Sequence, residues 1–313
     1  MSLSPSSIVD NFSTAGNSNS VSNLSGSSIS DQMTIFPGSS FFKKNRASTL
    51  PTPAEVRARN EKTGNPRAKY FDRPSPVIFS SLGLLVKYGG NVTVIEAQTQ
   101  MMVRESLQDK VPIPEVFGWT KDGDQTFIYM SFIEGVTLQD RWPTMEKDEK
   151  DAVCKQLNQI MKALRTLKQD DHDPYIGSLG KQPLNEIIIR SRPELAGPYY
   201  GANAVQQFQD ACGINIDVKA RIVFTHNDLA PPNIILASGP NPKVAAIIDF
   251  GQAGWLPAYW EYCKAKWVRI DPRHFSDDAQ EELHTEYLPK ILNRVDDKTH
   301  YHPWFYFALS NGC

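Results

Sequence analysis

This sequence of 313 residues lacks the features that mark membrane, secreted and nucleic-acid-binding proteins. No run approaches the roughly 18 uninterrupted apolar residues of a membrane helix, and the N-terminus lacks the basic-then-apolar pattern of a secretion signal. Its 33 Lys and Arg residues are balanced by 35 Asp and Glu residues, so there is no basic excess for nucleic acid or an anionic membrane. The sequence therefore predicts a soluble cytoplasmic protein with neither nucleic-acid nor membrane partners.

Cysteine is scarce as well, and the four cysteines of the chain form no CxxC pair. They stand far apart, at Cys154, Cys212, Cys263 and Cys313. This spacing provides neither a metal-binding pair nor a dense disulfide framework. We expect isolated thiols in a reducing compartment.

The N-terminal segment, residues 1–76, is short of periodic apolar residues. Fifteen of its first fifty residues are serine, and five prolines follow between residues 51 and 76. Such a composition buries too little surface to offset the entropy of ordering the chain. We therefore expect residues 1–76 to be disordered apart from a short helix near residues 54–61, with the folded part starting near Val77. Deletion of residues 1–70 should then leave the melting temperature unchanged.

Residues 77–134 read as a small sheet with one helix. Strands are expected at residues 77–79, 84–87, 116–119 and 126–130, with a turn at residues 122–124. Thr93 and Glu96 form a capping-box pattern at the start of a helix that carries an apolar face. This part of the chain predicts a compact α+β unit.

Residues 135–313 are mainly helical in pattern. Apolar residues recur every three or four positions between Val153 and Leu167, and further helices are expected at residues 259–269 and 276–292. Three short apolar runs, at residues 221–225, 234–236 and 244–248, each stop at polar residues. We expect the chemistry of the protein at those stops.

The most informative pattern joins two of these stops. His226, Asp228 and Asn233 follow the first run as HxDxxxxN, and Asp249 opens a DFG triplet after the third run. Phosphoryl transfer from a nucleotide needs a carboxylate at the attacking hydroxyl and oxygen ligands for Mg²⁺. Alone, Asp228 and Asn233 could be ordinary turn formers, and Asp249 could be an ordinary residue that closes a strand. The two motifs together, in this order and after apolar strands, predict phosphoryl transfer.

At these residues the sequence resembles the protein-kinase-like superfamily and, within it, the aminoglycoside phosphotransferase family, particularly its branch abundant in fungi. The resemblance covers roughly residues 77–269. It rests on the two loops above and on Val86-Lys87-Tyr88-Gly89, Ile113-Pro114-Glu115-Val116, residues 129–135 and residues 253–262. It implies a bilobal protein-kinase-like α+β fold: a small N-lobe with an antiparallel sheet and one helix (77–134), a larger mainly helical C-lobe (135–313), and ATP between the lobes.

The resemblance also implies roles for single residues. Asp228 looks like the catalytic carboxylate that accepts or orients the hydroxyl proton, and Asn233 and Asp249 look like the Mg²⁺ ligands. His226 is expected to brace the loop of the catalytic site rather than to transfer a proton itself. ATP and Mg²⁺ are the implied cofactors.

Lys87 ends an apolar run, so a strand would carry its ammonium to the nucleotide phosphates with a helix carboxylate to hold it. Glu96 is the natural partner and Glu105 a second one. Alternatively, Lys87 lies at the end of a strand and faces solvent, and Glu96 only caps the helix together with Thr93.

The segment around Met130 and Phe132 resembles the connection between the lobes, whose backbone would bind the adenine edge. Both residues could equally be plain core residues. No GxGxxG motif precedes Lys87, only Ser80-Ser81-Leu82-Gly83, so the loop that covers the phosphates should be short or absent.

The sequence thus predicts an ATP-dependent phosphotransferase that acts on a hydroxyl of a small molecule. A non-catalytic kinase-like nucleotide-binding module is the alternative, and a protein kinase is a weaker one. The acceptor and the oligomeric state cannot be inferred from the sequence. An acidic run between Asp271 and Glu286 would suit a cationic acceptor or, alternatively, only the N-terminal end of a solvated helix.

Overall fold

The computed structural model describes residues 33–108, 110–169 and 172–311. The described residues form two compact units: an N-terminal unit of residues 33–102 and 114–132, and a C-terminal unit of the described residues in 103–113 and 133–311. In the described part of the chain, no helix is both long and apolar enough to span a membrane. Cys154, Cys212 and Cys263 are free thiols, as expected, while Cys313 lies outside the described residues.

The N-terminal unit is built on a five-stranded antiparallel sheet with the strand order β1-β4-β5-β3-β2. Its elements are β1 (Thr34–Ile35), α2 (Ser40–Lys43), α3 (Pro53–Lys62), β2 (Val77–Phe79), β3 (Leu84–Gly89), β4 (Val116–Asp122) and β5 (Gln125–Ser131), and α4 (Val94–Leu107) begins in it. The four predicted strands and the predicted helix are confirmed. The hydroxyl of Thr93 accepts a hydrogen bond from the Glu96 N–H at 3.3 Å, as the capping pattern indicates.

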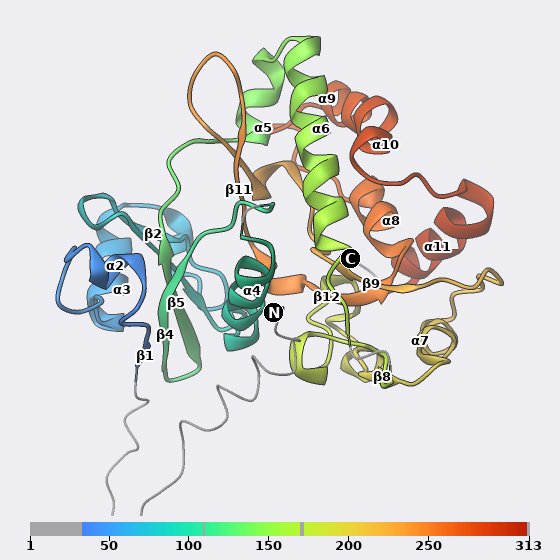
Figure 1. Cartoon of the computed structure of the whole chain (residues 1–313), viewed down its shortest axis with the longest axis horizontal. Helices are drawn as coiled ribbons and strands as arrows, with labels where there is room; N and C mark the ends of the chain where they lie inside the picture. Colours follow the sequence, from blue (N-terminus) through green and yellow to red (C-terminus); the bar gives the residue numbers. More distant parts are fainter. Residues whose placement is uncertain (1–32, 109, 170–171, 312–313) are drawn as a thin grey trace, which may run out of the picture. The chain divides into compact units, whose positions relative to one another are not determined.

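The expectation of a disordered segment up to residue 76 is wrong for residues 33–76, although the short helix expected near residues 54–61 is confirmed as α3. Strand β1 extends the sheet, and the helices α2 and α3 lie beside it (Figure 1). Phe41, Leu50 and Val56 are buried in the same core as Val77 and Leu84. These few large apolar residues anchor a segment whose average composition is polar, and in the described residues α2 and α3 accompany α4 in this unit. Residues 1–32 lie outside the described residues.

Local sequence explains how this segment joins the sheet. Thr52 and Glu55 form a capping box at the start of α3, and Pro53 occupies the first helical position, where its missing N–H costs nothing. At Gly118 on β4, a Cβ atom would lie only 2.4 Å from the carbonyl oxygen of Thr34. Glycine therefore permits the close approach of β1.

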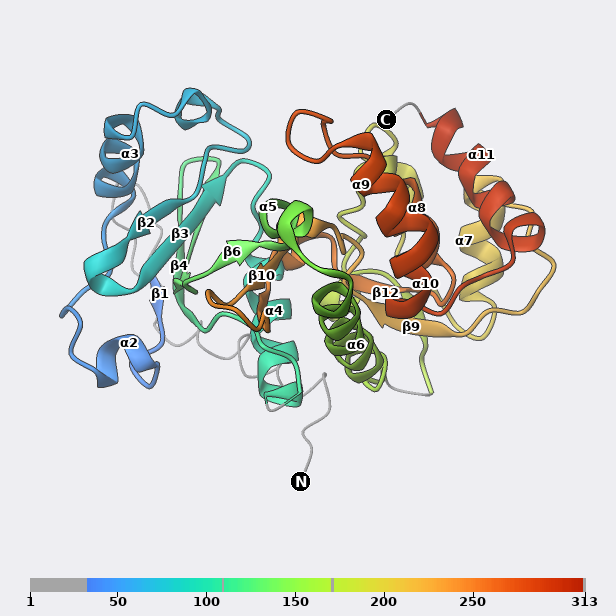
Figure 2. The same cartoon turned by 90° about the horizontal axis from the view of Figure 1, so that it is seen from above.

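The C-terminal unit is larger and mainly helical. Its helices and strands are β6 (Val136–Thr137), α5 (Leu138–Arg141), α6 (Lys147–Leu164), β7 (Tyr175–Ile176), β8 (Tyr199–Tyr200), α7 (Ala204–Cys212), β9 (Ile222–Thr225), β10 (Ile234–Leu236), β11 (Val244–Ile247), β12 (Gly254–Pro257), α8 (Trp260–Trp267), α9 (Asp277–Glu282), α10 (Leu288–Ile291) and α11 (His302–Ser310). Helices α8, α9, α10 and α11 gather at one end of this unit (Figure 2). The expected helices and apolar strands are confirmed, although the stretch from Ser276 to Leu292 contains a π-helical turn, Leu283–Tyr287.

Short helical turns complete both units. The 3₁₀ turns are Pro66–Lys69, Ser80–Leu82, Trp142–Thr144, Leu179–Lys181, Ile187–Ile189, Pro193–Leu195, Pro231–Asn233 and Phe250–Gln252, and a second π-helical turn is Asp297–Tyr301. Two of them, Pro231–Asn233 and Phe250–Gln252, follow strands of the C-terminal unit and carry the residues of the two motifs.

Two small antiparallel sheets frame the motifs in this unit. Strand β9 pairs with β12, and β10 lies between β11 and β6. The loop from His226 to Asn233 joins β9 to β10, and Asp249 follows β11 two residues after its end. The fold is thus a mixed α and β architecture, with a small antiparallel sheet in one unit and a larger, mainly helical second unit.

Candidate active site

The loop between β9 and β10 is closed by two hydrogen bonds to one of its own carbonyl groups. The Nδ2 of Asn233 donates to the carbonyl oxygen of Asp228 at 2.9 Å, and the N–H of Ala230 donates to the same oxygen at 2.8 Å. In the described part of the chain no donor is hydrogen-bonded to the carboxylate of Asp228, which is half-buried. The loop therefore presents a carboxylate on a fixed backbone, as a group that takes or orients a proton requires.

His226 is held in one tautomer by two backbone groups. Its Nδ1 accepts a hydrogen bond from the Asp228 N–H at 3.3 Å, so the proton of a neutral ring must be on Nε2, which lies 2.9 Å from the Ile248 carbonyl. The ring is fully buried and lies edge-on to Phe250, with 4.8 Å between centroids. Both nitrogens are engaged with backbone, so His226 links the two motifs and is a positioning residue.

Asp249 follows β11 in a backbone conformation that few residues adopt. Its φ of 64° and ψ of 69° are left-handed, a region in which Asp is tolerated better than most side chains. The Ile248 N–H donates to the Asn233 carbonyl at 3.0 Å, which places Asn233 and Asp249 at neighbouring ends of β10 and β11. The two residues predicted as metal ligands are thus brought together.

The donor set of these two residues suits Mg²⁺. The Nδ2 of Asn233 donates to the Asp228 carbonyl, so the Oδ1 is the atom of this side chain that could bind a metal. The Asp249 carboxylate supplies a second type of oxygen ligand. Mg²⁺ is held in proteins by one or two such side chains together with phosphate oxygens and waters. The residues present therefore fit a metal that arrives with a nucleotide.

Beneath the loop lies a buried carboxylate, Glu261 of α8. Its Oε2 accepts from the His226 N–H and its Oε1 from the Asn227 N–H, both at 2.8 Å. Burial raises the pKa of Glu261, while His226, Arg165 and these two donors oppose the rise. The side chain holds the two residues that precede Asp228, one of which, Asn227, has a left-handed φ of 63°.

A second buried carboxylate, Glu186, lies on the other side of Asn227. Its Oε2 accepts from the Asn227 Nδ2 at 2.7 Å, and its Oε1 lies 2.6 Å from the ammonium of Lys264. Lys264 also donates to the Oε1 of Gln252 at 2.8 Å. Because Gln252 belongs to the turn that follows Asp249, this network joins the DFG turn to the loop of Asp228.

Sequence reasoning missed Asn227, Glu186, Gln252, Glu261 and Lys264. For Glu261 and Lys264 the sequence holds a signal, because both lie next to the large or apolar residues Trp260, Tyr262 and Cys263. Charged residues in such a buried stretch are normally paired, so the pattern indicates buried polar contacts. Glu186 lies before an irregular stretch of 3₁₀ turns and has no comparable pattern around it.

The N-terminal unit carries the predicted lysine pair. The Nζ of Lys87 on β3 lies 2.6 Å from Oε1 of Glu96 on α4, and the Glu96 side chain is 3% exposed against 23% for Lys87. The side chain of Glu96 thus binds Lys87, while the cap of α4 is made by the Thr93 hydroxyl and the Glu96 backbone. The alternative partner, Glu105, has an exposed side chain. The pairing of Lys87 with Glu96 is the arrangement that a phosphate-binding lysine needs.

The predicted adenine contacts, Met130 and Phe132, lie at the end of β5. Met130 is buried, with Leu85 and Val116 paired to it from the strands on both sides. The N–H of Phe132 donates to the Gly83 carbonyl at 3.0 Å. Adenine binding by these backbones stays a prediction, since in this conformation the N–H of Phe132 is already used.

The connection between β2 and β3 is short, as the absence of GxGxxG indicates. It consists of the 3₁₀ turn Ser80–Leu82 and Gly83, whose φ is 53°. The guanidinium of Arg46 donates to the carbonyls of Leu82 and Gly83 at 2.9 and 3.1 Å, and a Cβ at Gly83 would lie 2.2 Å from its Nη1. The segment before residue 76 therefore fixes this turn.

The chain is similar to known aminoglycoside phosphotransferases. An aminoglycoside 3'-phosphotransferase from Enterococcus faecalis is 22% identical over 221 residues, which cover 67% of this chain and 76% of that protein. Among solved structures, aminoglycoside-3'-phosphotransferase of type VIII gives a TM-score of 0.47 at 16% identity, covering 82% of this chain and 98% of that one. The aminoglycoside phosphotransferase APH(3'')-Id from Streptomyces rimosus gives 0.42 at 19% identity, covering 76% and 91%.

The sequence profile of the phosphotransferase enzyme family matches residues 93–291, which include the Asp228 loop, Asn233 and Asp249. The match spans well over half of the 313 residues, and the chain therefore belongs to the phosphotransferase enzyme family.

Proposed function

We propose that this protein transfers the γ-phosphate of ATP to a hydroxyl group of a small molecule, with Mg²⁺ as the metal. The observation that carries the proposal is the hydrogen-bonded linkage between the two motifs. Asn233 binds the backbone of Asp228, and its own carbonyl accepts from Ile248 beside Asp249. A carboxylate for the acceptor and two ligands for the metal are thereby fixed to one another.

Each residue has one task in this mechanism. Asp228 orients the acceptor hydroxyl and takes its proton as the oxygen attacks the γ-phosphorus. The bond from this phosphorus to the oxygen bridging the β- and γ-phosphates breaks, and ADP leaves, while His226 and Glu261 keep the loop in place. Asn233 and Asp249 would hold Mg²⁺, which when bound neutralises charge on the phosphates. Lys87, held by Glu96, would contact the α- and β-phosphates.

Two substitutions test the proposal. Asp228→Asn should leave Mg²⁺·ATP binding nearly intact and lower turnover about a hundredfold or more, a loss typical of removing a general base. Asp249→Ala should instead weaken the Mg²⁺-dependent part of nucleotide binding, because it removes a metal ligand. Isothermal titration with ATP, with and without Mg²⁺, and transfer of labelled phosphate to a panel of alcohols measure both. Turnover at the wild-type level in Asp228→Asn would overturn the role of this residue.

A non-catalytic nucleotide-binding module is the second candidate. The short turn between β2 and β3 favours it, since this turn has no glycine-rich stretch to cover phosphates. Such a module would show nucleotide-dependent thermal stabilisation but no phosphate transfer to any acceptor. A protein kinase is a weaker alternative, because the profile that matches is that of the phosphotransferase enzyme family. Membership of the fungal branch and a cytoplasmic location remain predictions from the sequence.

A further inference from the structure

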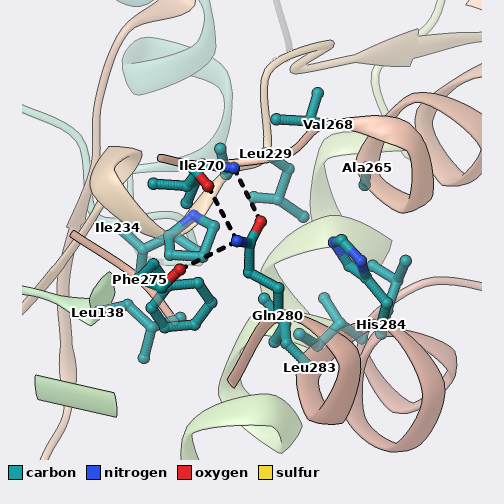
Figure 3. Close-up of a pocket in the computed structure, with 14 residues that line it drawn as sticks. Leu138, Leu229, Ile234, Ala265, Val268, Ile270, Phe275, Gln280, Leu283 and His284 are labelled. Atoms are coloured by element: carbon teal, nitrogen blue, oxygen red, sulfur yellow. Dashed lines mark hydrogen bonds between the residues drawn. The ribbon is translucent and has the colours of Figure 1, made fainter. Parts of the chain in front are cut away.

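The hollow beside α9 that Figure 3 shows belongs to the core of the C-terminal unit. Its volume of about 30 Å³ holds little more than one water molecule. The amide of Gln280 closes its wall, since the Oε1 accepts from the Ile270 N–H at 2.8 Å and the Nε2 donates to the carbonyls of Ile270 and Phe275 at 2.9 Å (Figure 3). This hollow is therefore too small for an organic ligand.

A much larger groove of the same unit lies at the start of β9, whereas the Asp228 loop follows the end of this strand. The groove has a volume of about 430 Å³, which is in the usual range of small-molecule sites. It is enclosed by residues that follow α6, by the start of α7 with the turn before it, and by the first residues of β9. Among the described residues that line it, none belongs to the HxDxxxxN or DFG motif. The groove is thus separate from the candidate active site.

Three cationic side chains line this groove, namely Arg165, Lys168 and Arg221. Lys168 and Arg221 are exposed, and within the described part of the chain neither side chain makes a hydrogen bond or an ion pair. Arg165 is half-buried and donates one hydrogen bond, from its Nη2 to the Ala258 carbonyl at 3.3 Å. None of the described lining residues is Asp or Glu. Three positive charges therefore share the groove without a carboxylate among them.

Several acidic side chains of this unit are paired with other cations. Asp173, which precedes Pro174 in the groove wall, pairs with Lys181. The acidic run that would have suited a cationic acceptor is engaged in the same way: Asp271 pairs with Arg273, Glu282 with Lys150, and Glu286 with Lys290. These carboxylates do not neutralise the cations of the groove.

Hydrogen bonds to the backbone fix the walls that carry these cations. Arg165 donates to the Ala258 carbonyl, and the Ala258 N–H donates to the Arg221 carbonyl at 2.9 Å. Gln169 fixes a second part of the wall, since its Nε2 donates to the Tyr175 carbonyl at 2.6 Å and its Oε1 accepts from the Tyr175 N–H at 2.8 Å. An anion would therefore bind to a prepared backbone, and only the ends of the cationic side chains would need to be ordered.

The rest of the lining is mainly apolar. Val223 on β9 and Trp255 on β12 are buried there, and Leu167, Val205 and Ile222 add further apolar surface. Apolar surface of this kind binds the hydrocarbon part of a ligand by removing it from water. A site that combines cations with apolar surface suits an anion with an apolar body better than an inorganic ion.

We propose that this groove binds a small organic phosphate, namely a phosphate monoester with an apolar body. At pH 7 such a group carries a charge of about −1.5 to −2 and presents three acceptor oxygens. These oxygens match the forked donors of Arg165 and Arg221 and the ammonium of Lys168. The inference goes beyond the proposed phosphotransferase function and does not depend on it.

Four probes test the chemistry of the ligand. Phenyl phosphate has both a ring and a phosphate, phenol lacks the phosphate, inorganic phosphate lacks the ring, and benzoate carries a single negative charge. Calorimetric titration of the full-length protein at pH 7.5 and low salt, without nucleotide, should show phenyl phosphate binding about tenfold or more tightly than phenol and several-fold more tightly than the other two. Added salt should weaken the binding of phenyl phosphate. Phenyl phosphate binding no tighter than phenol or benzoate would overturn the inference.

A matched set of variants tests the location by removing charge. Arg221→Gln and Lys168→Gln each remove an exposed cation from the groove and should weaken phenyl phosphate binding about tenfold. Lys219→Gln removes the same charge from an exposed position that is not among the lining residues, and it should change the affinity by less than about twofold. Equal losses in Arg221→Gln and Lys219→Gln would reduce the effect to net charge and overturn the site.

A second pair of variants adds charge instead. Ala202→Glu places a carboxylate at an exposed position of the groove wall and should weaken phenyl phosphate binding about tenfold. Ala211→Glu, at an exposed position of α7 that is not among the lining residues, should leave the affinity unchanged. Wild-type affinity in Arg221→Gln, Lys168→Gln and Ala202→Glu would overturn the proposed location.

The candidate nucleotide site is tested separately, because it offers phosphate another cation. Lys87→Met should leave phenyl phosphate binding unchanged, since Lys87 belongs to the N-terminal unit and does not line the groove. Loss of binding in Lys87→Met, with wild-type affinity in the groove variants, would assign the phosphate to the nucleotide site and overturn the inference. Failure of the wild type to transfer phosphate from ATP would overturn the proposed function alone, because the groove variants report on binding without nucleotide.

Discussion

The ammonium of Lys264 and the carboxylate of Glu186 lie 2.6 Å apart, with only 2% and 0% of their side chains exposed. Glu186 also accepts hydrogen bonds from Asn227 and from the indole N–H of Trp260. Helix α8 and the segment before Ile187 are therefore tied to the residue that precedes Asp228. The pair links the stability of the C-terminal unit to the geometry of the candidate active site.

Lys264→Met should destabilise the protein by about 3–5 kcal/mol, because it leaves the Glu186 carboxylate buried without its cation. The double variant Lys264→Met/Glu186→Gln should recover part of this loss, since no charge is left unpaired. Urea unfolding followed by circular dichroism measures both. As a control, Arg192→Met breaks an exposed pair with Glu194 and should cost at most about 1 kcal/mol. A loss of that small size in Lys264→Met would contradict the assigned role of the pair.

The grouping of the main candidate residues could be predicted from the sequence because these residues stand in two contiguous motifs. Asp228, Asn233 and Asp249 lie within 22 residues at the ends of three apolar strands, and the structure brings their backbones together. Glu186 could not be found this way, because it lies 41 residues before Asn227 and reaches it only through tertiary packing. Local patterns carry no information on such a contact.

Lys87→Met should lower turnover with ATP about a hundredfold or more, since it removes the cation that would contact the phosphates. Glu96→Gln should give a smaller loss, because the lysine keeps its charge and loses only the carboxylate that orients it. Steady-state kinetics over a range of ATP concentrations separates the two. Lys121→Met, at an exposed position of β4, is the control. Equal kinetics for Lys87→Met and this control would exclude Lys87 from the nucleotide site.

Phe41→Ala should destabilise the N-terminal unit by about 3–5 kcal/mol, the usual cost of removing a buried aromatic ring. Phe41 is fully buried and packs against Phe117 of β4, with 5.2 Å between ring centroids. Phe71→Ala, at a side chain that is 56% exposed, should change the stability little. Differential scanning calorimetry compares them. A similar melting temperature for both variants would show that residues 33–50 do not contribute to the core.

The burial of Phe41, Leu50 and Val56 in the core also reverses the expectation for deletion of residues 1–70. This deletion should now lower the melting temperature. The segment from Met33 to Phe42 holds several large apolar residues among serines and a glycine, with neither the 3.6- nor the 2-residue period. A window average therefore reads it as disordered. The segment is held by two separate contacts: β1 pairs with β4, and Phe41 packs in the core. Both depend on parts of the chain that are distant in sequence, so a local pattern does not reveal them.

The last prediction concerns the dependence of stability on pH. The pKa of His284 is lowered from 6.5 to about 4, first by burial and then by Arg269 and Lys266. Between these values the unfolded chain binds a proton that the folded protein does not. The contribution of neutral His284 to the free energy of unfolding is therefore complete above pH 6.5, and it is lost progressively as the pH falls toward 4. His284→Gln removes this loss, so relative to the wild type the variant should gain about 2 kcal/mol between pH 7.5 and pH 4.5. Urea unfolding at both pH values measures the difference, and a constant gap between His284→Gln and the wild type would show that His284 is protonated alike in the folded and unfolded states.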